Sequence, residues 1–291
     1  MARESSCIWL TGTCACSLAA IRNLPGKKVL GHHYHHFGER GAAVRWFAFY
    51  HALCRELDIV TYPTDFTRNE ALRIVPWMRR NTHVVRYGFP VHYTNETERR
   101  QRQTAARRRL NLPQDAWIVG NGGWLISRKR FDIFLETARR VRDRIPNAFF
   151  VICGNGPLEE KLKIRVSRLN LSNAVRFTGW VEDLDLYYQA WDVCLFNSDL
   201  DALGRTPMEA AAHGCLVAAS VRYGGLGEFL THGENGIFYT SHDCDLLARE
   251  IAALAANPAR AEALRAAAAE KLRISYSPQR AAAFYKSIFS E

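Results

Sequence analysis

Residues 193–214 read VCLFNSDLDALGRTPMEAAAHG. The apolar run at 193–196 predicts a buried strand, and residues 207–213 predict a short helix that begins with Pro207 and ends at Gly214. A strand that passes through a glycine-containing loop into a helix is typical of a βαβ unit. This stretch therefore favours a parallel sheet that is covered by helices.

Short apolar runs alternate with amphipathic stretches on both sides of this segment. Strands are expected at 116–119, 148–153, 175–178, 193–196, 216–220 and 236–239. Helices are expected at 131–144, 158–169, 184–191, 207–213 and 241–255, the last with Ser241 as its N-cap, and again after Pro258. The pattern predicts one doubly wound α/β domain at 113–275, followed by a closing helix at 276–291 that packs back toward the N-terminal domain.

The first 112 residues are less regular. Strands are expected at 7–10, 28–30, 59–62 and 83–87, a helix at 44–56, and a connecting helix and linker at 97–112. These elements amount to about half of a second α/β domain. The sequence thus predicts a partial N-terminal α/β domain with its linker at 1–112, in front of a complete C-terminal one.

The composition is that of a folded chain, because 48% of its 291 residues are hydrophobic and 23% are charged. The longest stretch without a charged residue, 5–21, is too short and too polar for a transmembrane helix and lacks the basic start of a signal peptide. We therefore expect a cytoplasmic protein. The eight cysteines form no Cys-x-x-Cys pair, which favours reduced core residues over disulfides or a zinc site.

The formal net charge is +10, and twelve arginines lie within 99–144. Such a field attracts nucleic acid, an anionic membrane or a phosphorylated small molecule, and composition does not choose among them. The run HHYHH at 32–36 invites a metal interpretation. No Cys, Asp or Glu at ligand spacing accompanies it, so surface or core histidines, or one functional histidine, are favoured over a metal site.

The segment 198–214 carries groups that suit a sugar phosphate. The N-terminus of its helix offers free N–H groups and a partial positive charge to a phosphate, and Arg205 adds a forked donor. Asp201 and Glu209 flank that position, and carboxylates accept hydrogen bonds from paired sugar hydroxyls. A second interpretation of Glu209 is equally open, because Thr206 and Glu209 have the spacing of a capping box.

This segment resembles the acidic-x7-Glu signature of the retaining, nucleotide-sugar-dependent glycosyltransferases of family 4, also called glycosyl transferases group 1, which have the GT-B fold. Asp201 stands where the family usually has Glu, and Gly204 and Glu209 are kept. The resemblance implies that Asp201 contacts the donor sugar and Glu209 the ribose hydroxyls, as the catalytic pair. Gly204, Arg205 and Thr206, at the start of the same helix, are donor-binding candidates.

A second segment, which starts at Gly123, resembles the family's Gly-Arg-Leu-x-x-x-Lys-Gly-x-Asp, whose Arg and Lys hold the donor diphosphate. Lys129 is kept and Trp124 replaces the Arg. Gly123 and Lys129 are thus donor-binding candidates by resemblance, although Lys129 by itself also fits a solvated basic face. Arg128 or Arg130 would replace the lost Arg only if the loop turned it inward.

Two further segments resemble the family in the same order. Residues 154–157 (GNGP) resemble its glycine turn after the second strand, and residues 177–181 (FTGWV) resemble the segment whose backbone contacts the nucleotide base. The resemblance makes Trp180 and Val181 donor-binding candidates. From the residues alone, Trp180 fits the core equally well.

The resemblance implies a GT-B-like chain with a complete C-terminal Rossmann-like donor domain and a partial N-terminal Rossmann-like domain on the acceptor side, since family members have a longer first domain. It implies a retaining, hexosyltransferase-like enzyme that moves a sugar from a nucleoside diphosphate sugar to a glycan or lipid-linked acceptor, with no metal or other cofactor. The arginines at 99–109 are expected to face solvent or an anionic membrane. That places the protein in the cytoplasm or peripherally at the inner membrane face.

Two other functions stay open. Trp124, Asp201 and the short first domain fit a catalytically impaired homologue or fragment that binds a nucleotide sugar without turnover. The positive charge fits a nucleic-acid-binding protein, although no recognition motif is present and no aromatic residues interleave with the arginines. A dehydrogenase is disfavoured, because no Gly-x-Gly-x-x-Gly follows a predicted strand.

Overall fold

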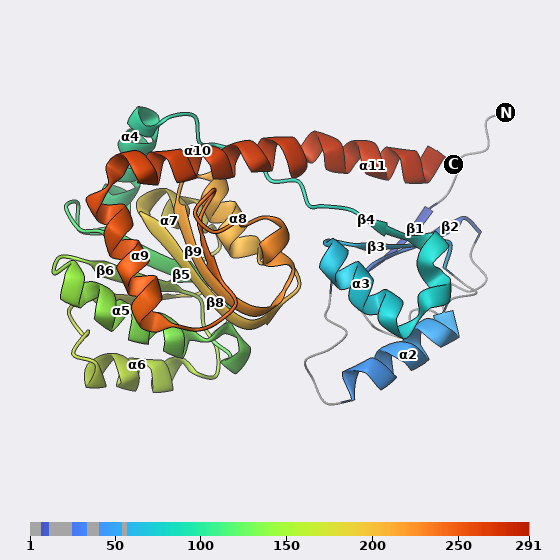
Figure 1. Ribbon diagram of the computed structural model, residues 1–291, viewed down its shortest axis with the longest axis horizontal. Coiled ribbons are helices and arrows are strands. Elements are labelled where there is room, and N and C mark those ends of the chain that lie inside the picture. The colour runs from blue at the N-terminus through green and yellow to red at the C-terminus, as the bar shows by residue number, and fades with distance from the viewer. Residues whose placement is uncertain (1–6, 12–24, 34–40, 54–56, 291) are drawn as a thin grey trace. The chain divides into compact units, whose positions relative to one another are not determined.

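The computed structural model describes residues 7–11, 25–33, 41–53 and 57–290 (Figure 1). The chain divides into two compact units. Unit 1 consists of Met1–Gly88 together with Ser275–Glu291, and unit 2 consists of Phe89–Ile274. Residues 89–112, which the sequence analysis places in the first domain with a linker at 97–112, therefore pack with unit 2.

Unit 1 contains a sheet of four parallel strands in the order β1-β2-β3-β4. The strands are β1 (Cys7–Thr11), β2 (Lys27–Gly31), β3 (Ile59–Tyr62) and β4 (Thr82–Val84). The described helices of the unit are α2 (Ala42–Leu53), α3 (Asp65–Ile74), the 3-10 helix η1 (Pro76–Asn81) and α11 (Pro278–Ser290). All four expected strands are present, whereas α3 is an addition to the expected elements.

Helix α3 has a cap that hydrophobic periodicity does not reveal. The Thr64 hydroxyl accepts the N–H of Thr67 over 3.1 Å, which satisfies one of the free donors at the helix start. Of its buried residues, Ala71 and Leu72 are apolar, whereas Thr67 and Glu70 are polar. The apolar stripe by which a helix is predicted is therefore weak here.

Helix α11 packs on the sheet of unit 1. Phe284 lies against Val29 and Ile59, so this C-terminal segment covers strands from the first 62 residues. At the start of the helix, a Cβ atom added to Gly88 would lie 2.5 Å from the Cα atom of Pro278. Only glycine fits where these two backbones meet.

Unit 2 contains six parallel strands in the order β10-β9-β8-β5-β6-β7. The strands are β5 (Ile118–Gly122), β6 (Phe149–Cys153), β7 (Val175–Gly179), β8 (Val193–Asp201), β9 (Leu216–Gly224) and β10 (Ile237–Tyr239). The helices are α4 (Glu96–Arg109), α5 (Phe131–Arg144), α6 (Glu159–Arg168), α7 (Asp185–Ala190), α8 (Arg205–Ala212), α9 (Cys244–Ala256) and α10 (Pro258–Ser275), with the 3-10 helices η2 (Ser127–Lys129) and η3 (Gly225–Glu228). Helix α5 packs on α6 and α9, while α7 packs on α4 and α8, so helices cover both faces of the sheet. The predicted doubly wound domain is confirmed.

The strand order has a switch point between β5 and β8. β5 leads through α5 to β6 on one side, and β8 leads through α8 to β9 on the other. At such a point the loops after the two strands separate, and ligands of open parallel sheets bind at the carboxyl ends of these strands. The fold therefore directs attention to the ends of β5 and β8.

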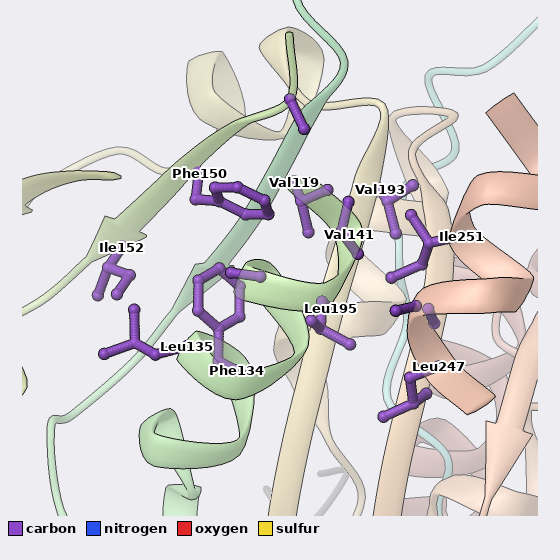
Figure 2. Close-up of a cluster of buried hydrophobic side chains, with 14 of the residues drawn as sticks. Val119, Phe134, Leu135, Val141, Phe150, Ile152, Val193, Leu195, Leu247 and Ile251 are labelled. Carbon is purple, nitrogen blue, oxygen red and sulfur yellow. The ribbon is translucent and has the colours of Figure 1, made fainter. Parts of the chain in front are cut away.

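The core of unit 2 fixes how α5 lies on this sheet. The helix expected at 131–144 is confirmed with the same bounds, and Phe134, Leu135 and Val141 point from it toward Val119 of β5 and Phe150 of β6 (Figure 2). All five side chains are fully buried. Burial of each contributes about 1.5–3 kcal/mol to stability. The position of α5 in turn fixes η2, which directly precedes it.

Strands β8 and β9 are longer than expected. Beyond the apolar residues they pair through Leu200 with Tyr223 and through Asp201 with Gly224. Because four of the five residues in the β8 extension, 197–201, are polar, the apolar pattern of β8 ends before the strand does. The extension places Asp201 in a strand instead of a loop.

The start of α9 also differs from the expectation. The N-cap is Asp243, whose Oδ1 accepts the N–H groups of Asp245 and Leu246 over 3.0 and 2.9 Å. Ser241 lies two residues earlier and is not the cap. A carboxylate that reaches two N–H groups replaces the expected hydroxyl.

Cys153, Cys194 and Cys215 are free and buried, as expected for core residues. Burial raises the pKa of the Cys153 thiol to about 12. The N-terminal cysteines, at positions 7, 14, 16 and 54, lie outside the residues whose side chains the structure describes. Within the described chain, no helix is long and apolar enough to cross a membrane.

Candidate functional site

Lys129 and Asp201 meet at the carboxyl ends of β5 and β8. Lys129 ends η2, and its Nζ donates to Asp201 Oδ2 over 2.5 Å and lies 4.8 Å above the centre of the Phe196 ring. The other carboxylate oxygen, Oδ1, accepts the N–H of Gly204 over 2.9 Å. The side chains of Lys129 and Asp201 are only 18% and 12% exposed, so the solvated-face interpretation of Lys129 is wrong.

Gly204 is the N-cap of α8. Its φ of +81° is a left-handed conformation that favours glycine, and no side chain caps the helix. Thr206 Oγ1 donates to the carbonyl of Gly122 at the end of β5, over 3.3 Å. The helix begins at Arg205, so Pro207 is its third residue and not its first as expected. The first-turn N–H groups, which favour an anion, therefore lie beside the ends of both strands.

Glu209 is held by two donors. Its Oε1 accepts from Arg205 Nη2 over 3.0 Å, and its Oε2 accepts from the Tyr188 hydroxyl over 2.9 Å. Thr206 is not the N-cap, so the capping-box interpretation of Glu209 is wrong. Burial raises the pKa of Tyr188, and the negative charge of Glu209 raises it further, which keeps the phenol protonated as a donor.

Three glycine turns join at the ends of β5, β6 and β7. The N–H of Gly123 donates to the Cys153 carbonyl over 2.9 Å, and that of Gly154 donates to the Gly179 carbonyl over 2.7 Å. A Cβ atom on Gly154 would lie 2.1 Å from the Gly123 carbonyl oxygen. The glycine turn recognised in the sequence therefore brings these three strand ends into contact next to η2.

Two tryptophans project from the same edge of the sheet. Trp124, after β5, is 61% exposed, and Trp180, after β7, is 76% exposed, so the core interpretation of Trp180 is wrong. Val181 beside it is half-buried. An exposed ring at this edge offers a surface on which a nucleobase can stack.

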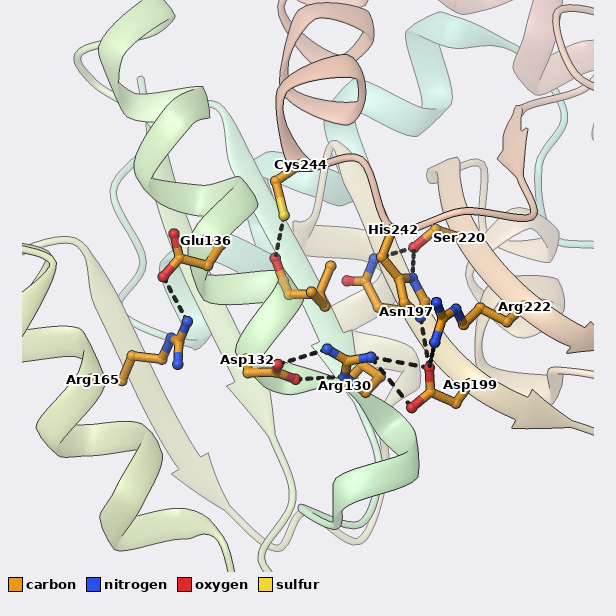
Figure 3. Close-up of polar contacts among 11 residues, drawn as sticks. Arg130, Asp132, Glu136, Arg165, Asn197, Asp199, Ser220, Arg222, His242 and Cys244 are labelled. Atoms are coloured by element: carbon orange, nitrogen blue, oxygen red, sulfur yellow. Dashed lines mark hydrogen bonds and ion pairs between the residues drawn. The ribbon is translucent and has the colours of Figure 1, made fainter. Parts of the chain in front are cut away.

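Arg128 and Arg130 are engaged with the protein itself. Arg130 donates to both oxygens of Asp132 over 3.0 and 2.9 Å and to Asp199 Oδ1 over 3.0 Å (Figure 3). Arg128 donates to the carbonyl of Leu200 over 3.1 Å. Arg130 is held by two carboxylates, whereas Arg128 stays exposed and bound to one carbonyl at the end of β8.

Asp199 is also hydrogen-bonded to a histidine. His242 Nε2 lies 3.0 Å from Asp199 Oδ1, and His242 Nδ1 lies 2.7 Å from Ser220 Oγ. Burial lowers the pKa of His242, Asp199 acts in the opposite direction, and the charge of Arg130 lowers it again, with a net decrease. The imidazole is therefore neutral near pH 7.

Much of the positive charge of 99–144 is paired within unit 2. Arg99 and Arg107 of α4 are buried, with ion pairs to Glu96 at 2.8 Å and to Asp192 at 2.7 Å. The expectation that these two arginines face solvent or a membrane is wrong. On α5, Arg139, Arg140 and Arg144 pair with Asp143, Glu136 and Asp245.

The described residues contain no group of three or more His, Cys, Asp or Glu side chains that could hold a metal ion. His32 is buried among the rings of Trp46, Tyr50 and Tyr62, at centroid distances of 4.6, 5.9 and 5.4 Å. It is a core histidine. His33 is half-buried and hydrogen-bonded to the Tyr87 hydroxyl, whereas residues 34–36 of the run lie outside the described residues.

Residues 102–271, more than half of the chain, match the family model Glycosyl transferases group 1. The chain belongs to this family. The lipopolysaccharide core biosynthesis glycosyltransferase LpsD of Rhizobium meliloti is 30% identical over 195 residues, which are 67% of this chain and 55% of LpsD. LpsE of the same organism, also described as a lipopolysaccharide core biosynthesis glycosyltransferase, is 31% identical over 151 residues, 52% of this chain and 43% of LpsE. The chain thus spans about half the length of the curated relatives that it matches.

Among solved structures, HepE of Anabaena, in complex with UDP and glucose, aligns with a TM-score of 0.83 at 18% identity, over 97% of this chain and 78% of HepE. This likeness, together with the two units of parallel α/β structure, establishes the GT-B fold that the sequence resemblance implied.

Three residues of the site region are missing from the sequence-based set: Tyr188, Asp199 and His242. Asp199 precedes Asp201 by two residues, but the predicted strand ends at 196, so their shared face follows only from the longer strand in the structure. Tyr188 and His242 reach their partners only through the tertiary fold. Nothing in their local sequence indicates those contacts.

Proposed function

We propose that this group 1 glycosyltransferase transfers a sugar from a nucleoside diphosphate sugar to an acceptor hydroxyl, with retention of configuration at the anomeric carbon. One observation carries the proposal. Lys129, Asp201 and the uncapped start of α8 contact one another at the switch point of the unit 2 sheet, and Glu209 lies on the same helix. A cation beside the N-terminus of a helix suits a diphosphate, and two carboxylates suit sugar and ribose hydroxyls.

In this proposal Lys129 and the first turn of α8, with Gly204, Arg205 and Thr206, bind the diphosphate. During transfer the bond between the anomeric carbon and the diphosphate oxygen breaks, and a bond to the acceptor oxygen forms. The proton of the acceptor hydroxyl leaves with the nucleoside diphosphate. Donors placed at the leaving group stabilise the negative charge that develops there.

The carboxylates orient the donor. Asp201 Oδ1 accepts the N–H of Gly204, and Oδ2 accepts from Lys129 Nζ. When a diphosphate takes over Lys129, the second oxygen becomes an acceptor for a sugar hydroxyl. Glu209 accepts the ribose hydroxyls, while Tyr188 fixes its other oxygen.

The nucleobase is assigned to the edge formed by Gly123, Trp180 and Val181. The exposed ring of Trp180 supports this assignment, since stacking on an aromatic surface tolerates any base. Because HepE was solved with UDP and glucose, UDP is the first nucleotide to test.

We further propose that transfer needs no metal, because Lys129 and the helix N–H groups supply the positive charge that magnesium provides elsewhere. Turnover in excess EDTA should equal turnover in added magnesium. Loss of turnover in EDTA, restored by magnesium, would contradict this part of the proposal.

The direct test is calorimetric titration of the protein with UDP, GDP and ADP, followed by turnover assays with the matching nucleotide sugars. We expect one nucleotide to bind, and Glu209→Ala to weaken it, whereas the exposed carboxylate variant Glu160→Ala should not. Equal affinity in Glu209→Ala would remove Glu209 from the site, and no binding of any nucleotide would refute the function. The anomeric configuration of the product, read by proton NMR, tests retention.

The acceptor is proposed to be a glycan, free or linked to a lipid. The names of LpsD and LpsE, both lipopolysaccharide core biosynthesis glycosyltransferases, support this class. Release of nucleoside diphosphate should accelerate when oligosaccharide or lipid-linked glycan acceptors are added. An acceptor panel that leaves the rate at the level of donor hydrolysis would contradict the assignment.

We also propose that α2 and η1 contact an anionic membrane. Val44, Phe47 and Trp77 are 73%, 45% and 52% exposed, and the rings of Phe47 and Trp77 lie 6.0 Å apart, so these residues form one apolar patch. Exposed Arg79 and Arg80 follow Trp77. Aromatic side chains bordered by arginine are typical of surfaces that enter the headgroup region of anionic bilayers.

Vesicle flotation tests this surface. We expect the protein to float with phosphatidylglycerol vesicles and not with phosphatidylcholine vesicles, and Phe47→Ser with Trp77→Ser to abolish flotation. The control is Ile164→Ser on α6, another exposed apolar residue. Flotation that is independent of lipid charge, or equal in the patch variant, would refute the proposal.

A further inference from the structure

A hydrogen-bonded chain runs through β8, β9 and the segment before α9, next to the site (Figure 3). Asn197 Nδ2 lies 2.8 Å from Ser220 Oγ, which lies 2.7 Å from His242 Nδ1, and His242 Nε2 lies 3.0 Å from Asp199 Oδ1. Asn197 and Ser220 are fully buried, and the His242 side chain is 7% exposed. The proposed function gives none of these residues a role.

The chemistry of the groups decides which atom is the donor in each of these hydrogen bonds. The amide of Asn197 donates to Ser220 Oγ, and the Asp199 carboxylate can only accept. Ser220 therefore donates to His242 Nδ1, and His242 Nε2 carries the hydrogen that Asp199 receives. The hydrogen bond from Ser220 thus fixes the His242 tautomer that carries its hydrogen on Nε2. This neutral form agrees with the lowering of the His242 pKa by burial.

Asp199, which His242 holds in place, also contacts the loop that carries Lys129. Arg130 pairs with Asp199 at 3.0 Å and with Asp132 in the first turn of α5 at 2.9 Å. Arg130 has a φ of +46°, a conformation that side-chain-bearing residues rarely adopt, so its contacts hold the backbone there. Lys129 is the residue directly before it.

Two ion pairs thus join the end of η2 and the residue after it to β8. Asp199 and Asp201 lie on one face of β8, because alternate strand residues share a face. Lys129 pairs with Asp201, and Arg130 pairs with Asp199. The hydrogen bonds of Arg128 and Ser198 across the same gap have uncharged carbonyl acceptors.

We propose that Asp199, fixed by His242, is a positioning residue that keeps η2 on β8 while Lys129 exchanges Asp201 for the donor diphosphate. The inference rests on the proposed function, in which the Lys129 bridge opens with each donor that binds. The Arg130 bridge stays closed and holds the Lys129 backbone in place. Asp199 and His242 therefore act on the diphosphate through Lys129, without touching it.

A double-mutant cycle tests this route. The probe is whichever of UDP, GDP or ADP binds the wild-type protein, and the measurement is its dissociation constant by calorimetry. We expect Asp199→Ala to weaken binding about tenfold in the wild-type background and less than about twofold in a Lys129→Ala background. Equal losses in both backgrounds would show that Asp199 acts independently of Lys129 and would overturn the inference.

A matched pair of histidine variants supplies a second measurement. His242→Gln places an amide nitrogen near the position of Nε2 and keeps a donor for Asp199, whereas His242→Asn reaches only as far as Nδ1. We expect Gln to retain the affinity for the probe within about twofold and Asn to lose about fivefold. Equal affinity of the two variants, at either level, would overturn the role of His242.

The controls separate this inference from the proposed function. Glu136→Gln alters a carboxylate on α5 that pairs with Arg140 and Arg165, away from β8, and should leave probe binding unchanged. A wild-type protein that binds no nucleotide refutes the proposed function itself. Nucleotide binding by the wild type that Asp199→Ala leaves unchanged refutes the positioning role alone.

Discussion

Lys129 Nζ lies 2.5 Å from Asp201 Oδ2, so the cation assigned to the diphosphate and the carboxylate assigned to the sugar neutralise each other. A nucleoside diphosphate sugar matches this pair, since it brings an anion for the lysine and hydroxyl donors for the aspartate. The two residues are therefore interdependent. Each should change ligand binding in its own way when it is removed.

Lys129→Ala should weaken nucleoside diphosphate binding by about 2 kcal/mol, or roughly thirtyfold, because a charge-assisted hydrogen bond to phosphate is lost. Calorimetry with UDP, or with whichever nucleotide binds, measures the effect. Lys161→Ala, which alters an exposed lysine of α6, is the matched control. Comparable affinities of the two variants would exclude Lys129 from the diphosphate site.

Asp201→Asn should lower the rate of sugar transfer without weakening nucleoside diphosphate binding. Without the carboxylate, Lys129 no longer has to leave an ion pair, so the affinity for nucleoside diphosphate should stay equal or increase. The rate of sugar transfer should fall at least about tenfold, because the acceptor for the sugar hydroxyl is weaker. The two assays together check this split, and a parallel loss of affinity and rate would argue against it.

Tyr188→Phe removes the hydroxyl that holds Glu209 Oε2 and leaves the carboxylate to Arg205. We expect nucleotide affinity to fall about fivefold, which corresponds to about 1 kcal/mol for one hydrogen bond. Tyr239→Phe, on β10, removes a hydroxyl outside this network and serves as the comparison. If both variants bind alike, Tyr188 has no part in placing Glu209.

Glu96 should matter for stability and not for nucleotide binding. It pairs with the buried guanidinium groups of Arg99 at 2.8 Å and Arg265 at 3.4 Å. Burial by itself would raise the pKa of Glu96, but the Arg99 hydrogen bond and the Arg265 charge lower it to about 2. Its folded-state pKa lies below the unfolded value of about 4.3, so its stabilisation is complete above that pH and is lost as pH falls toward 2.

Glu96→Gln should therefore lower the free energy of unfolding by about 3 kcal/mol at pH 7, since two buried arginines lose their carboxylate. The difference from the wild type should shrink as the pH falls below about 4. Urea unfolding at neutral and acidic pH measures both effects. Glu98→Gln, which alters a carboxylate 54% exposed, should cost less than about 0.5 kcal/mol, and a pH-independent difference for Glu96→Gln would contradict the assignment.

Most of unit 2 was predictable from the sequence because its elements bury apolar residues at a regular period. Helix α5 has the predicted bounds, and the strands β5 to β10 start within two residues of the expectation. Their register on the sheet follows from which face is apolar.

Helix α4 shows where this reasoning stops. Its buried residues Arg99, Gln103 and Arg107 recur every four positions, so the helix has an inward stripe that is polar. Gln103 and Arg107 are satisfied by Asp192, a residue more than 80 positions away. Hydrophobic periodicity does not register such a stripe, and the arginines were assigned to the surface.

The site was predictable in part for a similar reason. Lys129, Asp201 and Glu209 stand in recognisable motifs, and the fold brings Lys129 and Asp201 together. The partner of Glu209 was not predictable, because Tyr188 belongs to a helix whose aromatic residues otherwise indicate core packing. Partners that meet only in the tertiary structure leave no local pattern.

Unit 1 is assembled from both ends of the described chain, since Phe284 of α11 covers Val29 and Ile59. During synthesis the ribosome releases every residue of unit 2 before α11 emerges. Unit 2 can therefore fold while the sheet of unit 1 still lacks its last helix. The order of translation thus sets an order of folding, in which the sheet that is synthesised first is completed last.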